Sequence, residues 1–336
     1  MPRTRHRFLT PRALATASIA AIAVAIAAAA SLLVGPFAIA PRTLLQTLLG
    51  SRPEAMEAQV IFTIRLPRLV AACIGGWALA VAGIVFQALL RNPLASEYTL
   101  GVSSGAALGA VGVALLHLSS PLATPVAAFL GAVSTIGIVL LLARARLAFE
   151  TNAAIMIGVI FTALANAALS LILSIVSPYE LQAFFFWFMG SFAEAEWRTL
   201  VPAAAVVVVL TAVIYAQAWT LNAIAVDEQF AAQVGVHVEV AKAILLISAS
   251  LLTAVVVSIA GTVGFVGLVV PHMARLAVGV DHRRLIPVAA LLGAALCVAA
   301  DLLARTLLAP NELPVGVVTA FIGVPVFVAL MRRPSV

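Results

Sequence analysis

The residues most suggestive of catalysis are GVSSG at positions 101–105, which have the G-x-S-x-G spacing of a nucleophile elbow. With His117 or His272 as the general base, this serine motif would make an intramembrane hydrolase. An elbow requires a strand, a sharp turn and a helix, and an all-helical chain cannot provide that context. Glycines in this stretch and at Gly109 also recur every four residues, which lets membrane helices approach closely. The motif therefore favours helix packing over catalysis.

Two other kinds of site lack the residues that they need. The glycine-rich stretch 261–267 is no phosphate loop, because the only lysine, Lys242, lies upstream and no G-x-x-x-x-G-K-[ST] pattern occurs. If ATP powers the protein, another chain binds it. The histidines have no spacing typical of metal ligands, so neither a metal nor another cofactor is expected. They are His6, His117, His237, His272 and His282.

Charged residues inside the apolar stretches are the remaining candidates for chemistry. Asp301 and Arg305 lie four residues apart, near the end of an apolar run, and could pair on one face of a helix. An ion-coupled secondary transporter needs charged side chains in the middle of its spans, and these are nearly absent. A secondary transporter is therefore an alternative that the sequence disfavours.

The composition places these residues in a membrane protein. Of the 336 residues 64% are hydrophobic and only 10% charged, with a mean hydropathy of +1.17, whereas soluble chains carry about a quarter charged residues. The pI near 10.3 does not indicate nucleic acid, because the positive-inside rule predicts basic residues beside membrane spans. Cys73 and Cys297 both lie in apolar runs, so a disulfide framework is not expected.

Apolar runs of membrane length predict an all-α polytopic protein with about ten transmembrane helices, in a single domain over residues 13–333. Residues 1–12 carry four arginines and are expected as a cytoplasmic tail, with both termini on the cytoplasmic side of the inner membrane. The segment 177–197 is too short to cross, so it is expected as a half-helix or interfacial segment. Glycines and Pro271 predict a broken or short helix in 261–275. The expected spans are 13–34, 69–90, two between 98 and 143, 151–176, 199–216, 243–259, 261–275, 285–308 and 315–330.

Between the sixth and seventh spans, residues 221–239 form the longest insert that has the pattern of folded structure. Asn222 is a candidate N-cap, while Asp227 and Glu228 suit a helix N-terminus. Gly235 suits the position just after a helix end. The capping pattern therefore predicts a short helix in this insert.

Two apolar residues of the insert, Phe230 and Val234, lie four apart and share a face with Ala231, so the helix is predicted to be amphipathic. Such a helix could lie at the membrane surface and pass motion from a soluble partner into the spans. A solvated loop is the alternative, since helix propensity is only a weak prior.

Five stretches of the sequence together closely resemble the FecCD family, the permease subunits of ABC importers for iron–siderophore complexes, haem and cobalamin. The similarity runs from about residue 65 to residue 333, and the combination of motifs is highly specific. The first span and the segment before Arg65 match only in general character. The stretches are RLPRLVAACIGG (65–76), RNPLA with LGVSSGAALGA (91–110), GFVGLVVPHMARL (264–276), DHRRLIP (281–287) and ELPVGVVTAFIGVPVF (312–327).

The resemblance implies a type II ABC importer permease, with ten helices per subunit and a homodimer whose pathway follows the two-fold axis. It implies two separate ATP-binding cassette subunits beneath the dimer, so that the permease itself is not an enzyme. It also implies a periplasmic or lipid-anchored binding protein that delivers the substrate from above. Membrane lipid is the remaining partner, and no nucleic acid is expected. In the family the connection between the sixth and seventh spans docks the ATPase. Here that connection is residues 221–238, which favours a helix that passes motion from a soluble partner into the spans over a solvated loop.

The gate of the family, at the cytoplasmic start of the fifth span, falls on Thr151 and Asn152. Cobalamin permeases tend to have a small hydroxylated pair followed by arginine, whereas Ala153 follows here, which favours a ferric siderophore or haem over cobalamin. Asn166 is the only strongly polar residue inside the fifth span, and it either lines the pathway or bonds to another helix.

Six arginines lie on or near the expected outer side, against the orientation rule, and three of them are candidates for docking. The six are Arg42, Arg52, Arg65, Arg68, Arg198 and Arg305. Arg65 and Arg68 are three apart at the start of the second span and are expected to present one positive surface. Arg305 lies at the outer end of the ninth span. In the resembling family, arginines at these positions receive acidic residues from the two lobes of the binding protein. Ordinary structural arginines are the alternative.

Overall fold

The computed structural model describes residues 11–331, with gaps at 36, 38, 51–55, 117, 119, 121 and 145–150. Every regular element in this part of the chain is a helix, which confirms the all-α fold. Most of the expected N-terminal tail lies outside the described residues. The elements are α1 (Pro11–Leu33), α2 (Pro41–Leu48), α3 (Met56–Gln59), η1 (Val60–Arg65), α4 (Leu66–Leu89), α5 (Val102–Leu115), α6 (Ala123–Arg144), α7 (Thr151–Leu173), α8 (Pro178–Phe188), α9 (Trp197–Ala216), α10 (Ala218–Val226), α11 (Glu228–Gln233), α12 (Val238–Ala260), α13 (Val266–Val278), α14 (His282–Thr306) and α15 (Val315–Met331).

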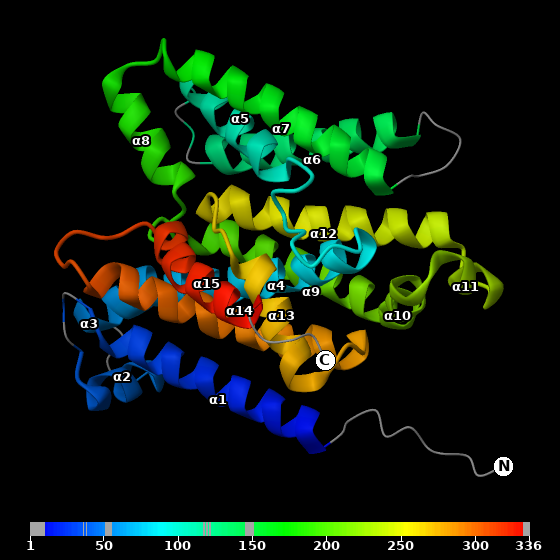
Figure 1. The fold of residues 1–336 in the computed structure, drawn as a ribbon. Helices are drawn as coiled ribbons and strands as arrows, with labels where there is room; N and C mark the ends of the chain where they lie inside the picture. The colour runs from blue at the N-terminus through cyan, green and yellow to red at the C-terminus, as the bar shows by residue number, and fades with distance from the viewer. Residues whose placement is uncertain are drawn as a thin grey trace.

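The long helices run side by side, with α4 and α12 at the centre of the bundle (Figure 1). α4 packs against α14, α12 and α13, while α12 packs against α4, α6 and α9. On one side of α12 the helices α5, α6 and α7 form a subgroup, and on the opposite side of the bundle α1 lies along α14. The core therefore joins helices from the first and last thirds of the chain.

Seven described helical stretches are long and apolar enough to cross a membrane, so the chain is a multi-spanning membrane protein. They are α1, α4 with the turns that precede it, α6, α7, α9, α12 and α14. Three shorter apolar helices, α5, α13 and α15, lie where the sequence predicted the other spans. The exact number of ten transmembrane helices and the side on which the termini lie remain predictions. Below, the two ends of the bundle are named after α11 and α3, which lie at opposite ends (Figure 1).

Glycines allow the closest contacts between helices. A Cβ on Gly76 of α4 would lie 2.1 Å from the carbonyl oxygen of Gly293 in α14. A Cβ on Gly105, in the GVSSG stretch, would lie 1.8 Å from the hydroxyl oxygen of Thr135 in α6. Both distances are shorter than any non-bonded contact, so only glycine fits. The GVSSG stretch follows turns and opens helix α5, without the strand that a nucleophile elbow requires.

The second span begins earlier than the sequence predicted. Val60–Arg65 form a π-helical turn that continues directly into α4, whereas residue 69 was expected to open the span. Pro67 follows the turn and has no N–H to donate, so a regular α-helical hydrogen bond is missing here in any case. π-helical turns are rare and occur mostly as single turns inside α-helices, and this one ends at Arg65.

Candidate functional site

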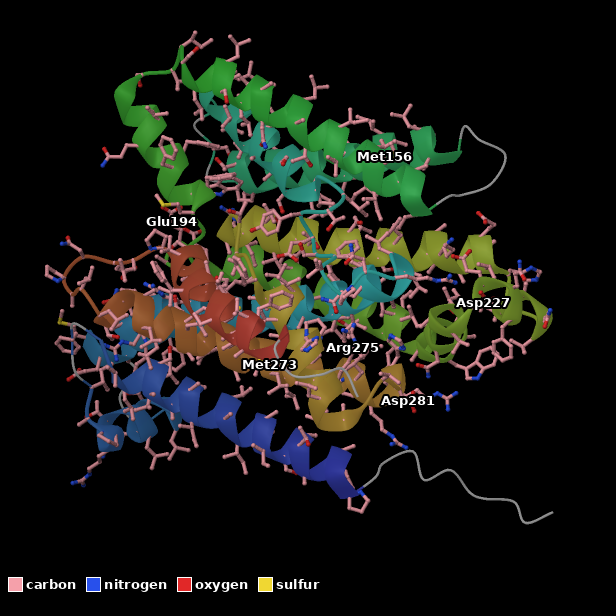
Figure 2. The ribbon with its side chains drawn as sticks, in the orientation of Figure 1. Met156, Glu194, Asp227, Met273, Arg275 and Asp281 are labelled. Atoms are coloured by element: carbon pink, nitrogen blue, oxygen red, sulfur yellow. The ribbon has the colours of Figure 1, made fainter. Side chains whose placement is uncertain are left out.

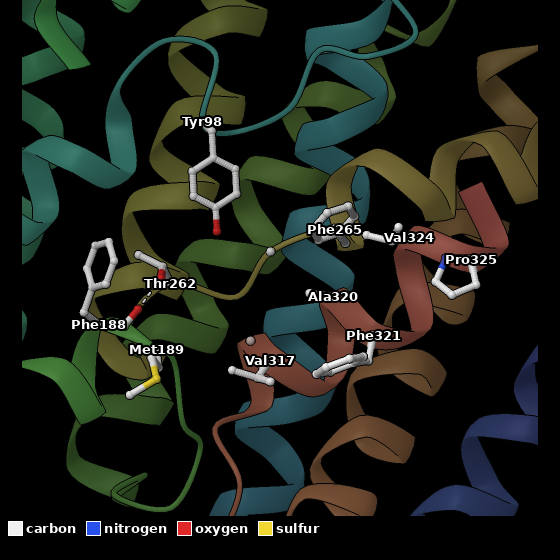
Figure 3. Close-up of a pocket in the computed structure, with 12 residues that line it drawn as sticks. Tyr98, Phe188, Met189, Thr262, Phe265, Val317, Ala320, Phe321, Val324 and Pro325 are labelled. Carbon is white, nitrogen blue, oxygen red and sulfur yellow. Dashed lines mark hydrogen bonds between the residues drawn. The ribbon is translucent and has the colours of Figure 1, made fainter. Parts of the chain in front are cut away.

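A cavity of about 570 Å³ opens between α8, α15 and the segment 261–265 that precedes α13 (Figure 3). Its lining is apolar and rich in aromatic rings, and none of the lining side chains is charged. The Tyr98 hydroxyl points into it from the connection between α4 and α5 (Figure 3). The largest side chains around it are Tyr98, Phe188, Met189, Phe265 and Phe321.

Hydrogen bonds and close packing join α8 and the loop after it to the end of α12 and to the segment 261–265 of the cavity wall. Thr262 Oγ1 donates a hydrogen bond to the carbonyl oxygen of Phe188, and Ser191 N donates to the carbonyl oxygen of Ala260 over 2.8 Å. The junction needs glycine at Gly261, where φ is +66° and a Cβ would lie 1.9 Å from the carbonyl oxygen of Trp187. The cavity wall is therefore one connected unit of α8, the end of α12 and the segment 261–265.

The cavity suits binding or passage of a ligand and offers no catalytic group. In the part of the chain that the structure describes, no group of three or more His, Cys, Asp or Glu side chains could hold a metal ion. Tyr98 and Thr262 supply hydroxyls, and the remaining lining is apolar. A bulky ligand with an apolar or aromatic periphery fits such a lining best.

The three arginines that are candidates for docking meet at the α3 end, in a cluster with two carboxylates. Arg68 Nε lies 2.9 and 3.0 Å from the two carboxylate oxygens of Asp301, and its Nη1 lies 2.9 Å from both oxygens of Glu312. Arg305 Nε lies 3.9 Å from Asp301, so the predicted Asp301–Arg305 pair exists, but Arg68 holds Asp301 more closely. We call Arg65, Arg68, Asp301, Arg305 and Glu312 the arginine cluster.

The other two arginines of the cluster hold the end of α1. Arg65 donates to the carbonyl oxygens of Leu32 and Phe37, and Arg305 donates to the backbone and side-chain oxygens of Ser31. A helix C-terminus presents carbonyl oxygens without partners in the helix, so it is a natural acceptor for guanidinium groups. α1 is thereby fastened to η1 and α14 at the α3 end.

Burial of this cluster corrects one expectation from the sequence. Arg65, Arg68 and Arg305 are only 4, 6 and 5% exposed, so they do not present an open positive surface in this chain. The physical reason is that the chain supplies its own acceptors, without which buried guanidinium groups would be costly. Docking of a binding protein to these arginines is untested and stays a prediction.

The predicted helix in the insert 221–239 is present as α11, at one end of the bundle (Figures 1 and 2). Asp227 is its N-cap and accepts hydrogen bonds from the backbone N–H groups of Gln229 and Phe230, at 2.8 and 3.0 Å. Gly235 follows the helix with φ of +88°, as expected for a residue just past a helix end. The sequence pattern therefore located the helix and its caps correctly.

The surface of α11 is amphipathic. Phe230 and Val234 are 46 and 43% exposed, whereas Ala231 is buried against the rest of the chain. The expectation that all three share one face is therefore wrong in detail, because Ala231 turns inward. The two larger apolar side chains remain open to a partner, and leaving them exposed to water is unfavourable.

Asn222 was expected to cap a helix, and this expectation is wrong. It lies inside α10, where its Nδ2 donates to Asp281 over 2.8 Å and its Oδ1 accepts from the His282 N–H over 2.9 Å. Asp281 in turn caps α14 by accepting from the Arg283 N–H over 3.1 Å. Burial alone would raise the pKa of Asp281, but these hydrogen bonds and the neighbouring arginines lower it below its ordinary value.

The expected gate residues are placed only in part. Thr151 and Asn152 begin α7, and their side chains lie outside the described residues. Asn166 lies on an exposed face of α7 and is not among the residues that line the cavity. A role for these residues across a subunit interface stays a prediction.

Glu97 is a buried polar residue that the sequence analysis missed. Both of its carboxylate oxygens are buried and have no hydrogen-bond partner among the described residues. A Cβ on Gly267 would lie 2.4 Å from Glu97 Oε2, so the carboxyl group lies against the start of α13. The signal in the sequence was a single acidic residue directly before the long uncharged stretch that begins at Tyr98, because a buried charge at such a position is costly unless it has a use.

The fold and the cavity define a class, namely a multi-spanning membrane protein with an uncharged, mostly apolar cavity that suits the binding or passage of a ligand. The model of the FecCD transport family matches residues 21–333, so the chain belongs to that family. Its curated relatives are named as permease proteins, and in this family ATP hydrolysis takes place in a separate subunit.

Named relatives cover nearly the whole chain. The hemin transport system permease HmuU of Yersinia pestis is 38% identical over 89% of this chain and 90% of its own length. The cobalamin import permease BtuC of Halobacterium salinarum is 41% identical over 84% of this chain and 76% of its own length. A solved metal-chelate type ABC transporter in an inward-facing conformation superposes with a TM-score of 0.83 at 30% identity, covering 94 and 98% of the two chains. The chain is therefore an ABC importer permease of this type.

Proposed function

We propose that this permease carries a ferric siderophore or haem across the inner membrane, using ATP hydrolysis on a partner subunit. The observation that supports this substrate class is the cavity of about 570 Å³, with its aromatic and apolar lining and no charged side chain. A metal chelate with an apolar periphery gains favourable contacts there, and the lack of fixed charge keeps its binding weak enough for release.

A homodimer is part of the proposal, and the exposed apolar side chains of α7 and α15 are the surfaces proposed to pack against the second copy. On α7 the side chains of Ile160 and Leu164 are 65 and 66% exposed, and on α15 that of Phe321 is 77% exposed. Phe321 also lines the open side of the cavity, so a second copy of the chain would close it. This arrangement would bring Thr151, Asn152 and Asn166 near the interface, as the family resemblance implies.

The ATPase contact is assigned to α11. Its exposed Phe230 and Val234 have the spacing of a helix that inserts into a groove, a common mode of recognition. Asp227 and Gly235 fix both ends of this helix, so it is held in shape before the partner binds. The proposal therefore takes the α11 end as the cytoplasmic end of the protein.

A substrate-binding protein is proposed to dock at the opposite end, on the arginine cluster. Glu312 is the exposed member of that cluster, with its side chain 44% accessible. Its carboxylate forms an ion pair with Arg68 from the solvent side. An acidic residue of a docking protein would compete with Glu312 for Arg68. Such rim charges act mainly on the association rate and its salt dependence.

Cobalamin is the second candidate substrate. It is supported by the named cobalamin permeases, which match this chain at 36 to 41% identity, about as well as the haem permease does. The departure at Ala153 from the pattern of cobalamin permeases favours the iron chelates.

Transport by the reconstituted complex tests the proposal. The permease is reconstituted with its ATPase and the binding protein from the same locus, and uptake of haemin, ferric hydroxamate siderophore and cyanocobalamin is compared. ATP-dependent uptake of haemin or the siderophore, reduced by Phe321→Ala in the cavity, is the expected result. Uptake of cyanocobalamin alone would assign the second candidate and refute the first.

A further inference from the structure

The only lysine of the chain, Lys242, is buried near the start of α12, with its side chain 2% exposed. Its Nζ lies 2.9 Å from both carboxylate oxygens of Glu228, the first residue of α11. Exposed ion pairs exchange partners easily, but a buried ammonium depends on its carboxylate for a favourable environment. The pair is therefore a fixed point of contact between α11 and α12.

The same carboxylate also faces α4. Arg91, two residues after α4, has its Nη2 atom 3.9 Å from Glu228 Oε1, and it donates to the carbonyl oxygen of Ile224 in α10 over 3.4 Å. Glu228 thus connects α11 to the ends of α12 and α4, the two central helices of the bundle. Exposed Phe230 lies on the same short helix, so a force applied there acts on Glu228.

α12 continues from Lys242 to the cavity. It runs from Val238 to Ala260 without interruption, about 34 Å at 1.5 Å per residue. Its far end leads into the segment 261–265, which lines the cavity and is hydrogen-bonded to α8 through Thr262. Protein interiors are densely packed and transmit strain, so a shift of α12 at Lys242 is expected to reach the cavity wall at its far end.

We propose that the Glu228–Lys242 pair is a strut that transmits movement of α11 to the cavity wall through α12. The inference rests on the proposed contact between α11 and an ATPase, but it gives Glu228 a different role from Phe230. Phe230 holds the partner, whereas Glu228 positions α12 relative to α11. Loss of Glu228 should therefore leave the ATPase bound and disconnect it from the cavity.

The test uses the permease dimer with its ATPase in nanodiscs, with ATP, magnesium and vanadate as the probe. Val317→Cys in the cavity lining, combined with Cys73→Ala and Cys297→Ala, reports the cavity through its rate of reaction with a maleimide. We expect the nucleotide to change this rate in the parent. Glu228→Gln, an isosteric change, should reduce the nucleotide-dependent change about tenfold, within the range of typical couplings between sites.

Further variants separate a strut from a general loss of structure. Lys242→Met should reduce the response as much as Glu228→Gln, and the double variant should be no worse than either single one. Glu194→Gln makes the same chemical change at an exposed residue between α8 and α9, far along the chain from Lys242, and should leave the response intact. In all of these variants the ATPase should remain bound to the permease, as measured by co-purification.

Two results overturn the strut. One is a full nucleotide response in the Glu228→Gln complex, and the other is a parent complex whose labelling rate does not change with nucleotide. If the proposed contact between α11 and the ATPase is wrong instead, the Phe230→Asp variant still co-purifies with the ATPase. A Phe230→Asp variant that loses the ATPase, beside a Glu228→Gln variant that responds normally, refutes the strut alone.

Discussion

Replacing Arg68 with methionine distinguishes a structural clamp from a docking residue. The substitution keeps most of the apolar stem and removes the guanidinium group that lies 2.9 and 3.0 Å from the oxygens of Asp301. Asp301 is completely buried, so it loses its closest partner without gaining access to water. Removing one partner of a buried pair costs about 3–5 kcal/mol.

Two features of the cluster place the expected loss at the lower end of that range. Arg305 Nε remains 3.9 Å from Asp301 and compensates in part. Glu312, the other carboxylate on Arg68, is 44% accessible and regains water, so its lost pair contributes little. We therefore expect Arg68→Met to lower the free energy of unfolding by about 3 kcal/mol.

The measurement is equilibrium unfolding of the purified permease in mixed micelles, titrated with SDS. Arg198→Met, at an exposed arginine of α9, is the matched control and should change stability by about 0.5 kcal/mol or less. Combining Arg68→Met with Asp301→Asn should recover part of the loss, because the buried charge is then removed. An Arg68→Met protein as stable as the parent, with weakened capture of the binding protein, would refute the clamp and support docking as the main role.

Three further predictions concern the α11 end and the core. Phe230→Asp places a charge on the exposed face of α11 and should abolish co-purification of the ATPase with no change in unfolding; retained ATPase would contradict the assignment. Gly83→Ala puts a Cβ 2.0 Å from the carbonyl oxygen of Gly267 and should lower the free energy of unfolding by about 1–3 kcal/mol. Gly112→Ala has open space around it and should not destabilise the protein. Equal unfolding curves for the two variants would contradict the close packing of Gly83 against Gly267. Because hydrogen bonds and arginines lower the pKa of Asp281 in the folded state, its contribution to stability is present above the ordinary value of 3.8 and is lost as the pH falls through the folded value. Asp281→Asn should therefore lower the melting temperature at pH 7, by an amount that shrinks in strong acid; a pH-independent difference would argue against this.

The sequence was informative where a feature depends on residues close together in the chain. The apolar runs located the spans, and glycines with Pro271 predicted the short helix that the structure shows as α13. Asp227 and Gly235 likewise marked both ends of α11, because capping is a property of four or five consecutive residues. Local patterns of this kind need no knowledge of the fold.

Features that join distant parts of the chain were not predictable in this way. Arg68 and Asp301 are separated by 233 residues, and only the packing of α4 against α14 brings them together. Asn222 has the right type for a cap, but Asp281 and His282, about 60 residues away, compete for its amide. Sequence spacing put Arg65 and Arg68 on one surface of a helix, and tertiary packing then buried that surface.

The attachment of α1 by arginines has a consequence for the synthesis of the protein. α1 is made first, yet one of the residues that fasten it, Arg305, lies 274 residues after Ser31. At about 5–20 residues per second, roughly 15–55 seconds of translation pass before that arginine is made. During this interval α1 must reside in the lipid without its final neighbours, and its composition permits this, because only 11% of its apolar window is buried even in the finished fold. The acceptors are mainly backbone carbonyl oxygens, so late attachment depends little on the side chains at the end of α1. The exceptions are the Ser31 hydroxyl, which also accepts from Arg305, and Gly35, where a Cβ would lie 2.9 Å from Arg65 Nη2.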